Sequence, residues 1–340
     1  MRMVWPRRAE LAEGDAKLTG PDLAEGIPSE SLADGQMLVG HAHGKAVLLA
    51  RVGDEIFAVA PHCAHYNGPL SEGLIVGDTV RCPWHHACFD VRTGEAVRAP
   101  ALSPIACWEV LQSNGVIKVG QKRERSQPRA LIEPTAKPER IVIVGGGAAG
   151  FAAAEMLRRV GYQNSIAMLS SDAALPYDRP NLSKDYLAGA IPLDYVSLRD
   201  ENFYQENGIE IQLGRNVVEL DVRTREVRLS DGKSIAYDGL LLATGAEPAR
   251  LTIPGAEQQH VHTLRSLADS NAIIEASKTS KRAVVIGASF IGLEVAASLR
   301  ARKLEVHVVA PCVSSGDPSM ASLILRTIEE KPSIEFEAFL

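Results

Sequence analysis

The chain has 340 residues, of which 46% are hydrophobic and 23% are charged, and its formal net charge is −6. This length allows two or three domains with ordinary apolar cores, and the acidic balance argues against a nucleic-acid partner. No apolar run approaches the ~18 residues of a membrane span, and the N-terminus lacks the continuous apolar core of a secretory signal. Three of the five cysteines, Cys88, Cys107 and Cys312, have no obvious disulfide pairing, so a reduced, cytoplasmic compartment is expected.

The first third of the chain predicts an all-β domain. Residues 1–35 are rich in Gly, Pro, Asp and Glu and show little periodicity, which predicts a loose lead-in segment. In residues 36–120, short apolar runs alternate with turn residues, which is typical of small antiparallel sheets. The predicted strands cover residues 37–39, 46–50, 56–60, 79–81, 87–91, 107–111 and 116–119.

Two boxes of cysteine and histidine lie where predicted strands of this domain end. They read C-A-H at Cys63–His65 and C-P-W-H at Cys82–His85, with sixteen residues between them. A Rieske [2Fe–2S] cluster needs one Cys and one His from each box, because one iron takes both thiolates and the other takes both imidazoles. Zinc also binds two Cys and two His, but zinc fingers usually place the two cysteines together. The boxes therefore favour a Rieske cluster held by Cys63, His65, Cys82 and His85.

Residues 121–138 are polar and charged and contain three prolines, which predicts a linker. Beyond them, apolar strands alternate with helices in two βαβ units that begin near residues 140 and 282, with short strands between residues 209 and 235. The predicted strands cover residues 141–144, 165–169, 283–286 and 306–309, and the predicted helices cover residues 148–160, 265–278, 290–302 and 323–330.

The first βαβ unit carries a dinucleotide-binding pattern, G-G-G-A-A-G, between its first strand and its helix. The loop residues are Gly145, Gly147, Ala148, Ala149 and Gly150. The glycines permit a tight turn, close approach of a pyrophosphate and packing of the helix on the strand, with the phosphates at the helix N-terminus. Asp172 follows the next strand, about 20 residues further on, where a carboxylate contacts a ribose hydroxyl.

The second βαβ unit carries a weaker form of the same pattern, G-A-S-F-I-G. Gly287 and Gly292 keep the outer positions, while Ser289 occupies the middle one. Serine is small, so close backbone approach to a dinucleotide is still expected. The next strand ends near Ala310 without a carboxylate or an arginine for the ribose, so the choice between NADH and NADPH stays open.

The order of these motifs resembles the Rieske-fused branch of the FAD-dependent, apoptosis-inducing-factor-like ferredoxin reductases, in the pyridine nucleotide-disulfide oxidoreductase superfamily. Further motifs that carry the resemblance are L-P-Y-D-R-P-N-L-S-K at 175–184, L-L-A-T-G-A at 241–246 and G-A-S-F-I-G-L-E at 287–294. The resemblance implies a multidomain fold with three cofactors, a [2Fe–2S] cluster, FAD and NAD(P)H. The expected domains are an all-β Rieske domain (36–120), an α/β Rossmann-like FAD-binding domain (139–264) and a partial NAD(P)-binding domain (265–340).

The same resemblance implies residue roles. In the family, the first glycine loop holds FAD and the second holds the nicotinamide nucleotide. The family lysine that matches Lys184 lies beside flavin N5 and pairs with the glutamate that matches Glu294. The segment that matches Thr244-Gly245 passes near the flavin, and Arg179 is likewise placed at FAD. A cation near N5 stabilises reduced flavin, and a glutamate partner limits the cost of desolvating that cation. Without the family, the residues themselves favour two solvated surface charges.

The residues that follow the boxes indicate a low cluster potential. After the first box, Tyr66, Asn67 and Gly68 lack the extra cysteine of respiratory Rieske proteins. After the second box, the sequence His86-Ala87-Cys88 lacks their serine hydroxyl. Fewer donors to the cluster sulfurs lower the potential, which points to about −150 mV. His86 stands where the family usually has glycine, and it is either a donor near the cluster or an exposed loop residue.

The predicted function is an oxidoreductase that moves electrons from NAD(P)H through FAD to the Rieske cluster and on to an acceptor. That acceptor is a ferredoxin, an oxygenase or a small molecule. The sequence ends about two strands into the second βαβ unit, whereas the family continues, so the alternative is a Rieske electron carrier or redox sensor with a non-catalytic flavoprotein half. A Rieske oxygenase is disfavoured, because no 2-His-1-carboxylate set follows the cluster domain.

Overall fold

The computed structural model describes residues 18–124, 138–311 and 334–339. The chain divides into two compact units, Met1–Leu131 and Ile132–Leu340, and the division falls inside the segment predicted as a linker. The helix predicted over residues 323–330 lies outside the described residues. Among the helices that the structure describes, none combines the length and apolar character of a membrane span.

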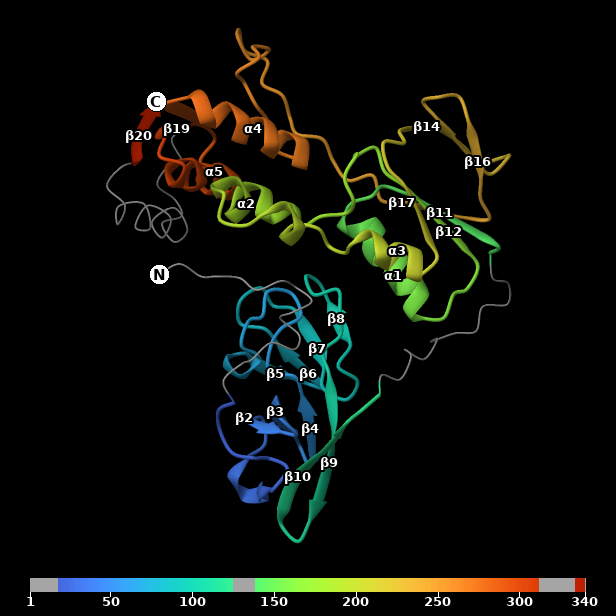
Figure 1. Ribbon diagram of the computed structural model, residues 1–340, viewed down its shortest axis with the longest axis vertical. Coiled ribbons are helices and arrows are strands. Elements are labelled where there is room, and N and C mark those ends of the chain that lie inside the picture. Colours follow the sequence, from blue (N-terminus) through green and yellow to red (C-terminus); the bar gives the residue numbers. More distant parts are fainter. Residues whose placement is uncertain (1–17, 125–137, 312–333, 340) are drawn as a thin grey trace. The chain divides into compact units, whose positions relative to one another are not determined.

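The first unit is all-β, as predicted, and consists of two antiparallel sheets (Figure 1). The larger sheet has the order β1-β10-β9-β4-β3-β2 and the smaller has the order β5-β6-β7-β8. The strands are β1 (Ile27–Pro28), β2 (Met37–Ala42), β3 (Lys45–Val52), β4 (Glu55–Val59), β5 (Leu74–Val76), β6 (Thr79–Arg81), β7 (Cys88–Asp90), β8 (Ala96–Arg98), β9 (Cys107–Ser113) and β10 (Val116–Lys122), with short 3₁₀ turns η1 (Ser29–Ser31) and η2 (Leu70–Glu72).

Part of the segment predicted as a loose lead-in packs into the core of the first unit. Leu23 and Leu32 are each only 1% exposed and lie in the core beneath the larger sheet, with Trp108 and Ile117. Strand β1 also pairs with β10. These apolar residues stand singly among Gly, Pro and acidic residues at irregular spacing, so no helix or strand period indicates their burial.

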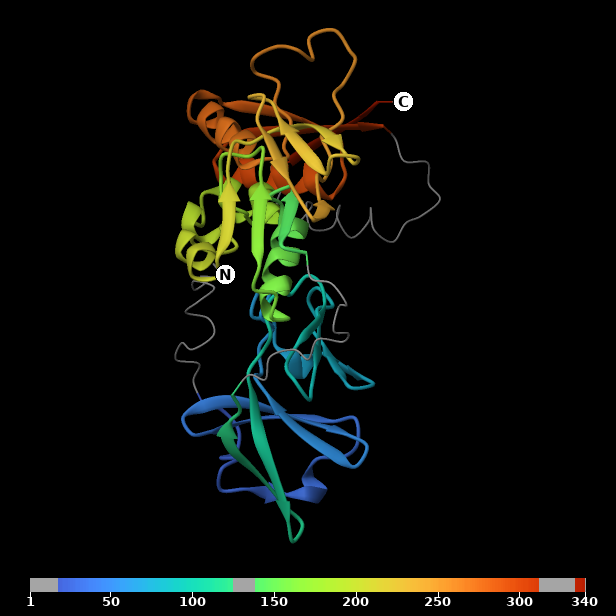
Figure 2. The ribbon, with the colours of Figure 1, turned by 90° about the vertical axis from the view of Figure 1, so that its right-hand side faces the viewer.

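The second unit begins with an α/β layer built on a parallel sheet. Its strand order is β13-β12-β11-β17, and Figure 2 shows these strands side by side. Helices α1 and α3 contact the sheet, and the meander β14-β15-β16 packs its Val227 and Leu229 against the sheet residues Val142 and Leu169. The elements are β11 (Arg140–Val144), α1 (Ala148–Arg159), β12 (Ser165–Leu169), α3 (Glu201–Glu206), β13 (Ile209–Gln212), β14 (Val217–Asp221), β15 (Glu226–Leu229), β16 (Ser234–Ala236) and β17 (Gly239–Leu242).

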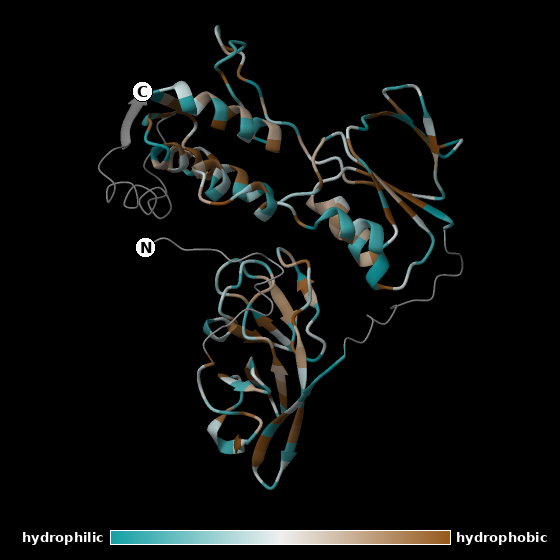
Figure 3. Cartoon of the chain, viewed as in Figure 1, coloured by the Kyte–Doolittle hydropathy of each residue, from teal (hydrophilic) through white to brown (hydrophobic). Residues whose placement is uncertain are grey.

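A second βαβ unit completes the described chain. Parallel strands β18, β19 and β20 form its sheet, and α5 packs its buried Ala296 and Leu299 against Val306 and Val308 of β19. Figure 3 shows apolar residues along the strands of both units and on parts of the helices of the second. The elements are α4 (Leu267–Thr279), β18 (Arg282–Ile286), α5 (Phe290–Ala301), β19 (Glu305–Pro311) and β20 (Ile334–Phe339). Between β12 and α3 the chain also forms η3 (Arg179–Ser183), α2 (Asp185–Ala188) and η4 (Leu193–Tyr195).

Candidate functional site

Two loops of the same design carry the Cys/His boxes. The first box lies between β4 and β5 and the second between β6 and β7. In each loop the residue four positions after the cysteine, Asn67 or His86, has a φ near +60°. The amide of that residue donates to the cysteine carbonyl, at 2.9 Å for Asn67 to Cys63 and 3.1 Å for His86 to Cys82. One left-handed residue therefore closes each loop around its thiol.

The two thiols are buried at the base of these loops. Cys63 and Cys82 are 3% and 2% exposed. Burial raises the pKa of the Cys63 thiol to about 12, and the neighbouring Cys82 adds to the increase, while the His65 amide opposes it. That amide donates to Cys63 Sγ at 3.4 Å. Two thiols so close and so poorly solvated are costly as thiolates unless a cation binds both, which is what an iron ion supplies.

The two imidazoles form a second pair beside the thiols. The ring centroids of His65 and His85 are 5.0 Å apart, and Tyr66 stacks on His65 at 3.8 Å. Within the described residues, no group of three or more His, Cys, Asp or Glu side chains converges on one metal position. A thiol pair beside an imidazole pair is the donor set of a Rieske cluster, in which each iron takes one pair.

The first glycine loop has the geometry that a dinucleotide requires. Gly145 has φ +122°, and a Cβ there would lie 2.1 Å from the carbonyl oxygen of Ala243. A Cβ on Gly150 would lie 2.0 Å from the carbonyl oxygen of Gly145. The strand β17 runs parallel to β11 and brings Thr244 and Gly245 to the same end of the sheet. Glycine is therefore required at both ends of the loop.

A cation lies beside the middle of this loop. The Arg179 Nη2 atom is 3.9 Å from the position of a Cβ on Gly147, and Gly147 is the N-cap of α1. The Arg179 Nε atom is buried and has no hydrogen-bond partner among the residues that the structure describes. A guanidinium and a helix N-terminus that face the same loop suit the pyrophosphate of a dinucleotide.

Asp172 is already engaged within the protein. Its Oδ2 accepts a hydrogen bond from the Tyr177 hydroxyl at 2.7 Å and its Oδ1 accepts one from the Ala174 amide at 3.0 Å. Burial and Asp172 together raise the pKa of Tyr177. Ser170 lies closer to the glycine loop, because a Cβ on Gly146 would meet its Oγ at 2.4 Å. Each carboxylate oxygen has a further lone pair, so the ribose contact of Asp172 stays a prediction.

The second glycine loop repeats the backbone of the first. Gly287 has φ +108°, and its amide donates to the carbonyl of Val309 at 2.8 Å, as the Gly145 amide does to Leu169 at 2.8 Å. A Cβ on Gly292 would lie 1.9 Å from the Gly287 carbonyl oxygen. Ser289 is the N-cap of α5 with φ −78° and ψ 176°, an extended conformation open to any residue. The serine therefore leaves the loop intact.

Lys184 and Glu294 meet although 110 residues separate them in the sequence. Lys184 Nζ lies 3.2 Å from Glu294 Oε1, and the two side chains are 46% and 28% exposed. The other carboxylate oxygen of Glu294 accepts a hydrogen bond from the Ser183 hydroxyl at 2.6 Å. The sequence motif contained Ser183 as the residue before Lys184, but its role could not be derived from the pattern.

Comparison with known proteins settles the family. Residues 25–109 match the Rieske [2Fe-2S] domain. Residues 139–337 match the pyridine nucleotide-disulphide oxidoreductase family. The chain belongs to the pyridine nucleotide-disulphide oxidoreductase family and carries a Rieske domain before it. The predicted resemblance, the fold class and the cofactor set of Rieske cluster, FAD and NAD(P)H are confirmed.

Relatives resemble the chain over one or both units. Human apoptosis-inducing factor 3 is 34% identical over 82% of this chain and 47% of its own length. The biphenyl dioxygenase system ferredoxin–NAD(+) reductase component of Paraburkholderia xenovorans is 40% identical over 54% of this chain and 44% of its own length. A crystal structure of the ferredoxin reductase for the CYP199A2 system from Rhodopseudomonas palustris superimposes with a TM-score of 0.55 and 35% identity over 59% of this chain and 50% of its own. The chain thus spans about half the length of these relatives.

Proposed function

We propose that the protein transfers electrons from NAD(P)H through FAD to a Rieske [2Fe–2S] cluster and from there to an acceptor. The observation that carries this proposal is the presence, in one chain, of two glycine loops with matching backbone geometry and a pair of cluster loops. FAD supplies the conversion of a two-electron hydride into single electrons for an iron–sulfur centre.

Each set of residues has a distinct task in this proposal. Cys63 and Cys82 hold one iron, and His65 and His85 hold the other. The loop around Gly145, with Arg179 and Asp172, binds FAD, and Thr244-Gly245 lines it. The loop with Gly287, Ser289 and Gly292 binds the nicotinamide nucleotide. Lys184, paired with Glu294, places a positive charge at the flavin, where negative charge develops on reduction.

The acceptor is proposed to be a redox protein of the ferredoxin or rubredoxin type or an oxygenase component, in a cytoplasmic compartment. The names of the relatives support this class, because they include reductases for ferredoxin and rubredoxin. The boundaries of 139–264 for the FAD-binding part and 265–340 for the NAD(P)-binding part belong to the same proposal.

Visible absorption of the FAD-loaded chain tests the reductase half of this proposal. Anaerobic addition of NADH or NADPH is expected to bleach the flavin bands within the mixing time of a manual experiment. Stoichiometric FAD whose absorbance neither nucleotide changes would contradict the proposed function, while dithionite bleaching of the same sample would show that the flavin is reducible.

A further inference from the structure

A buried serine fixes the carboxylate that pairs with Lys184. Ser183 is 5% exposed, and its hydroxyl donates to Glu294 Oε2 at 2.6 Å. The other oxygen of the same carboxylate, Oε1, forms an ion pair with Lys184 Nζ at 3.2 Å. Each oxygen of Glu294 therefore has its own donor, and rotation of the carboxylate breaks both contacts.

A second serine ties the same helix to the Lys184 segment. Ser298 lies four residues after Glu294 on α5, so both side chains project from one face of that helix. The Ser298 hydroxyl donates to the carbonyl oxygen of Ser183 at 2.8 Å and to that of Lys184 at 3.1 Å. The residue pair Ser183-Lys184 therefore donates a hydrogen bond to α5 and also accepts hydrogen bonds from it.

The ion pair alone is too weak to hold Lys184 in place. Pairs as exposed as Lys184–Glu294, at 46% and 28%, contribute little by themselves, because water screens them and long side chains lose entropy on pairing. A hydrogen bond from a buried hydroxyl to a carboxylate is stronger and more directional. The geometry of the pair is therefore set by Ser183 rather than by charge attraction.

We propose that Ser183 is a positioning residue for electron transfer from the nicotinamide nucleotide to FAD. It holds Glu294 so that the other carboxylate oxygen keeps the Lys184 ammonium at the flavin. This inference rests on the proposed function. Since α5 also begins at the second glycine loop, the nucleotide loop and the carboxylate move as one element.

The kinetic test compares three variants of the FAD-loaded chain under anaerobic conditions. In Ser183→Ala, the rate of flavin bleaching by NADH is expected to fall about tenfold, the effect of losing one hydrogen bond to a charged group, with the NADH KM within about twofold of wild type. Ser183→Thr keeps the hydroxyl and is expected to recover most of the rate. Ser270→Ala is the matched control, because Ser270 is a buried α4 serine that donates to the Leu182 carbonyl at 3.0 Å.

The result that overturns the proposal is a Ser183→Ala rate no lower than that of Ser270→Ala, or a Thr variant that fails to recover the rate. A second readout does not depend on activity. The wild type and Ser183→Ala are treated with a limiting amount of acetylating reagent, and acetylation of Lys184 is measured relative to that of Lys278. In Ser183→Ala this ratio is expected to rise about threefold, the scale of a lost, partly exposed ion pair. If NADH never bleaches the wild-type flavin, the proposed function fails, and an unchanged acetylation ratio separately overturns the role of Ser183.

Discussion

Among single residues, the four cluster ligands are the sharpest prediction from the sequence, because few sites use one thiol and one imidazole from each of two boxes. The family comparison confirms the Rieske domain that contains them. The role of His86 was left open by the sequence, since a side chain pattern does not reveal a backbone angle. The structure gives His86 a φ of +59° and so explains why glycine suits this position.

Replacement of His86 by glycine should stabilise the first unit. His86 is a non-glycine residue in the left-handed region, which costs on the order of 1 kcal/mol. We expect His86→Gly to raise the free energy of unfolding by about 0.5 kcal/mol after the entropy of glycine is subtracted. Denaturant titration followed by cluster absorption measures this change. Asn67→Gly, at the matching position of the other loop, should change it less, because Asn tolerates this conformation better.

Loss of one thiol ligand should remove the cluster without removing the flavin. Cys82→Ser is expected to abolish the Rieske EPR signal and the bound iron, while the FAD content stays near that of wild type. Cys88 is an equally buried cysteine at 3% exposure, and its Sγ donates to the His86 carbonyl at 3.3 Å. Cys88→Ser should therefore keep the cluster, and loss of iron from both variants to the same extent would contradict the ligand assignment.

At the level of elements, the interiors of long strands and helices were predictable and the short edge strands were not. The strands β11, β12 and β18 contain all the residues predicted for them. By contrast, β1, β5 and β8 have only two or three residues each, which is too short to show a period of two. Their pairing depends on neighbours that are distant in the sequence, which a local pattern does not contain.

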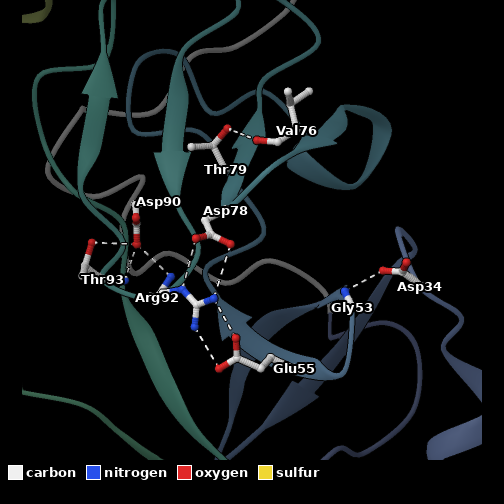
Figure 4. A network of polar contacts seen from close by, with 9 residues as sticks. All are labelled: Asp34, Gly53, Glu55, Val76, Asp78, Thr79, Asp90, Arg92 and Thr93. Carbon is white, nitrogen blue, oxygen red and sulfur yellow. Dashed lines mark hydrogen bonds and ion pairs between the residues drawn. The ribbon is translucent and has the colours of Figure 1, made fainter.

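An arginine joins the two sheets of the Rieske unit, as Figure 4 shows. Arg92, two residues after β7, donates to both carboxylate oxygens of Glu55 at 2.9 and 2.6 Å. It also lies 3.4 Å from Asp78 and 4.7 Å from the ring centroid of Phe57. Since β4 belongs to the larger sheet and the β5–β6 turn to the smaller one, this exposed network links the two sheets.

The Arg92 network predicts an acid-dependent loss of stability. The hydrogen bond from Arg92 holds the pKa of Glu55 below its ordinary value of 4.5. A lowered folded-state pKa gives stability that is present above the unfolded value and is lost as the pH falls through the folded value. The melting temperature of the Rieske unit should therefore fall less steeply between about pH 5 and pH 3 in Arg92→Met than in wild type. The melting temperature is measured from the cluster absorption at each pH. If it falls with the same slope in Arg92→Met and in wild type, this prediction is contradicted.

The second glycine loop predicts different effects on NADH affinity for two substitutions at the start of α5. Ser289 has an ordinary extended backbone, so Ser289→Gly should leave the Kd for NADH within about twofold. Gly292→Ala places a Cβ 1.9 Å from the Gly287 carbonyl oxygen, which must displace the loop. We expect the Kd to rise at least about tenfold, and equal affinities in a fluorescence titration would contradict this loop as the nucleotide site.

For the whole molecule, the sequence yielded the order of its parts more readily than the contacts between distant residues. Lys184 and Glu294 are an example, because physical reasoning on the residues alone favoured two separate surface charges. Only the family resemblance paired them, and the structure places them 3.2 Å apart. Ser183 was missed, since a hydroxyl next to a lysine has no pattern that indicates its partner 111 residues away.

The central claim is that reducing equivalents from the nicotinamide nucleotide reach the cluster within this chain. The most direct measurement is the EPR spectrum of the purified, FAD-loaded chain, frozen before and after anaerobic addition of NADH. The account predicts that the signal of a reduced Rieske cluster appears with NADH in wild type. It predicts no such signal in Cys82→Ser, in which the flavin is still bleached. A wild-type flavin that is fully bleached by NADH beside a cluster that stays EPR-silent, yet is reduced by dithionite, would contradict the account.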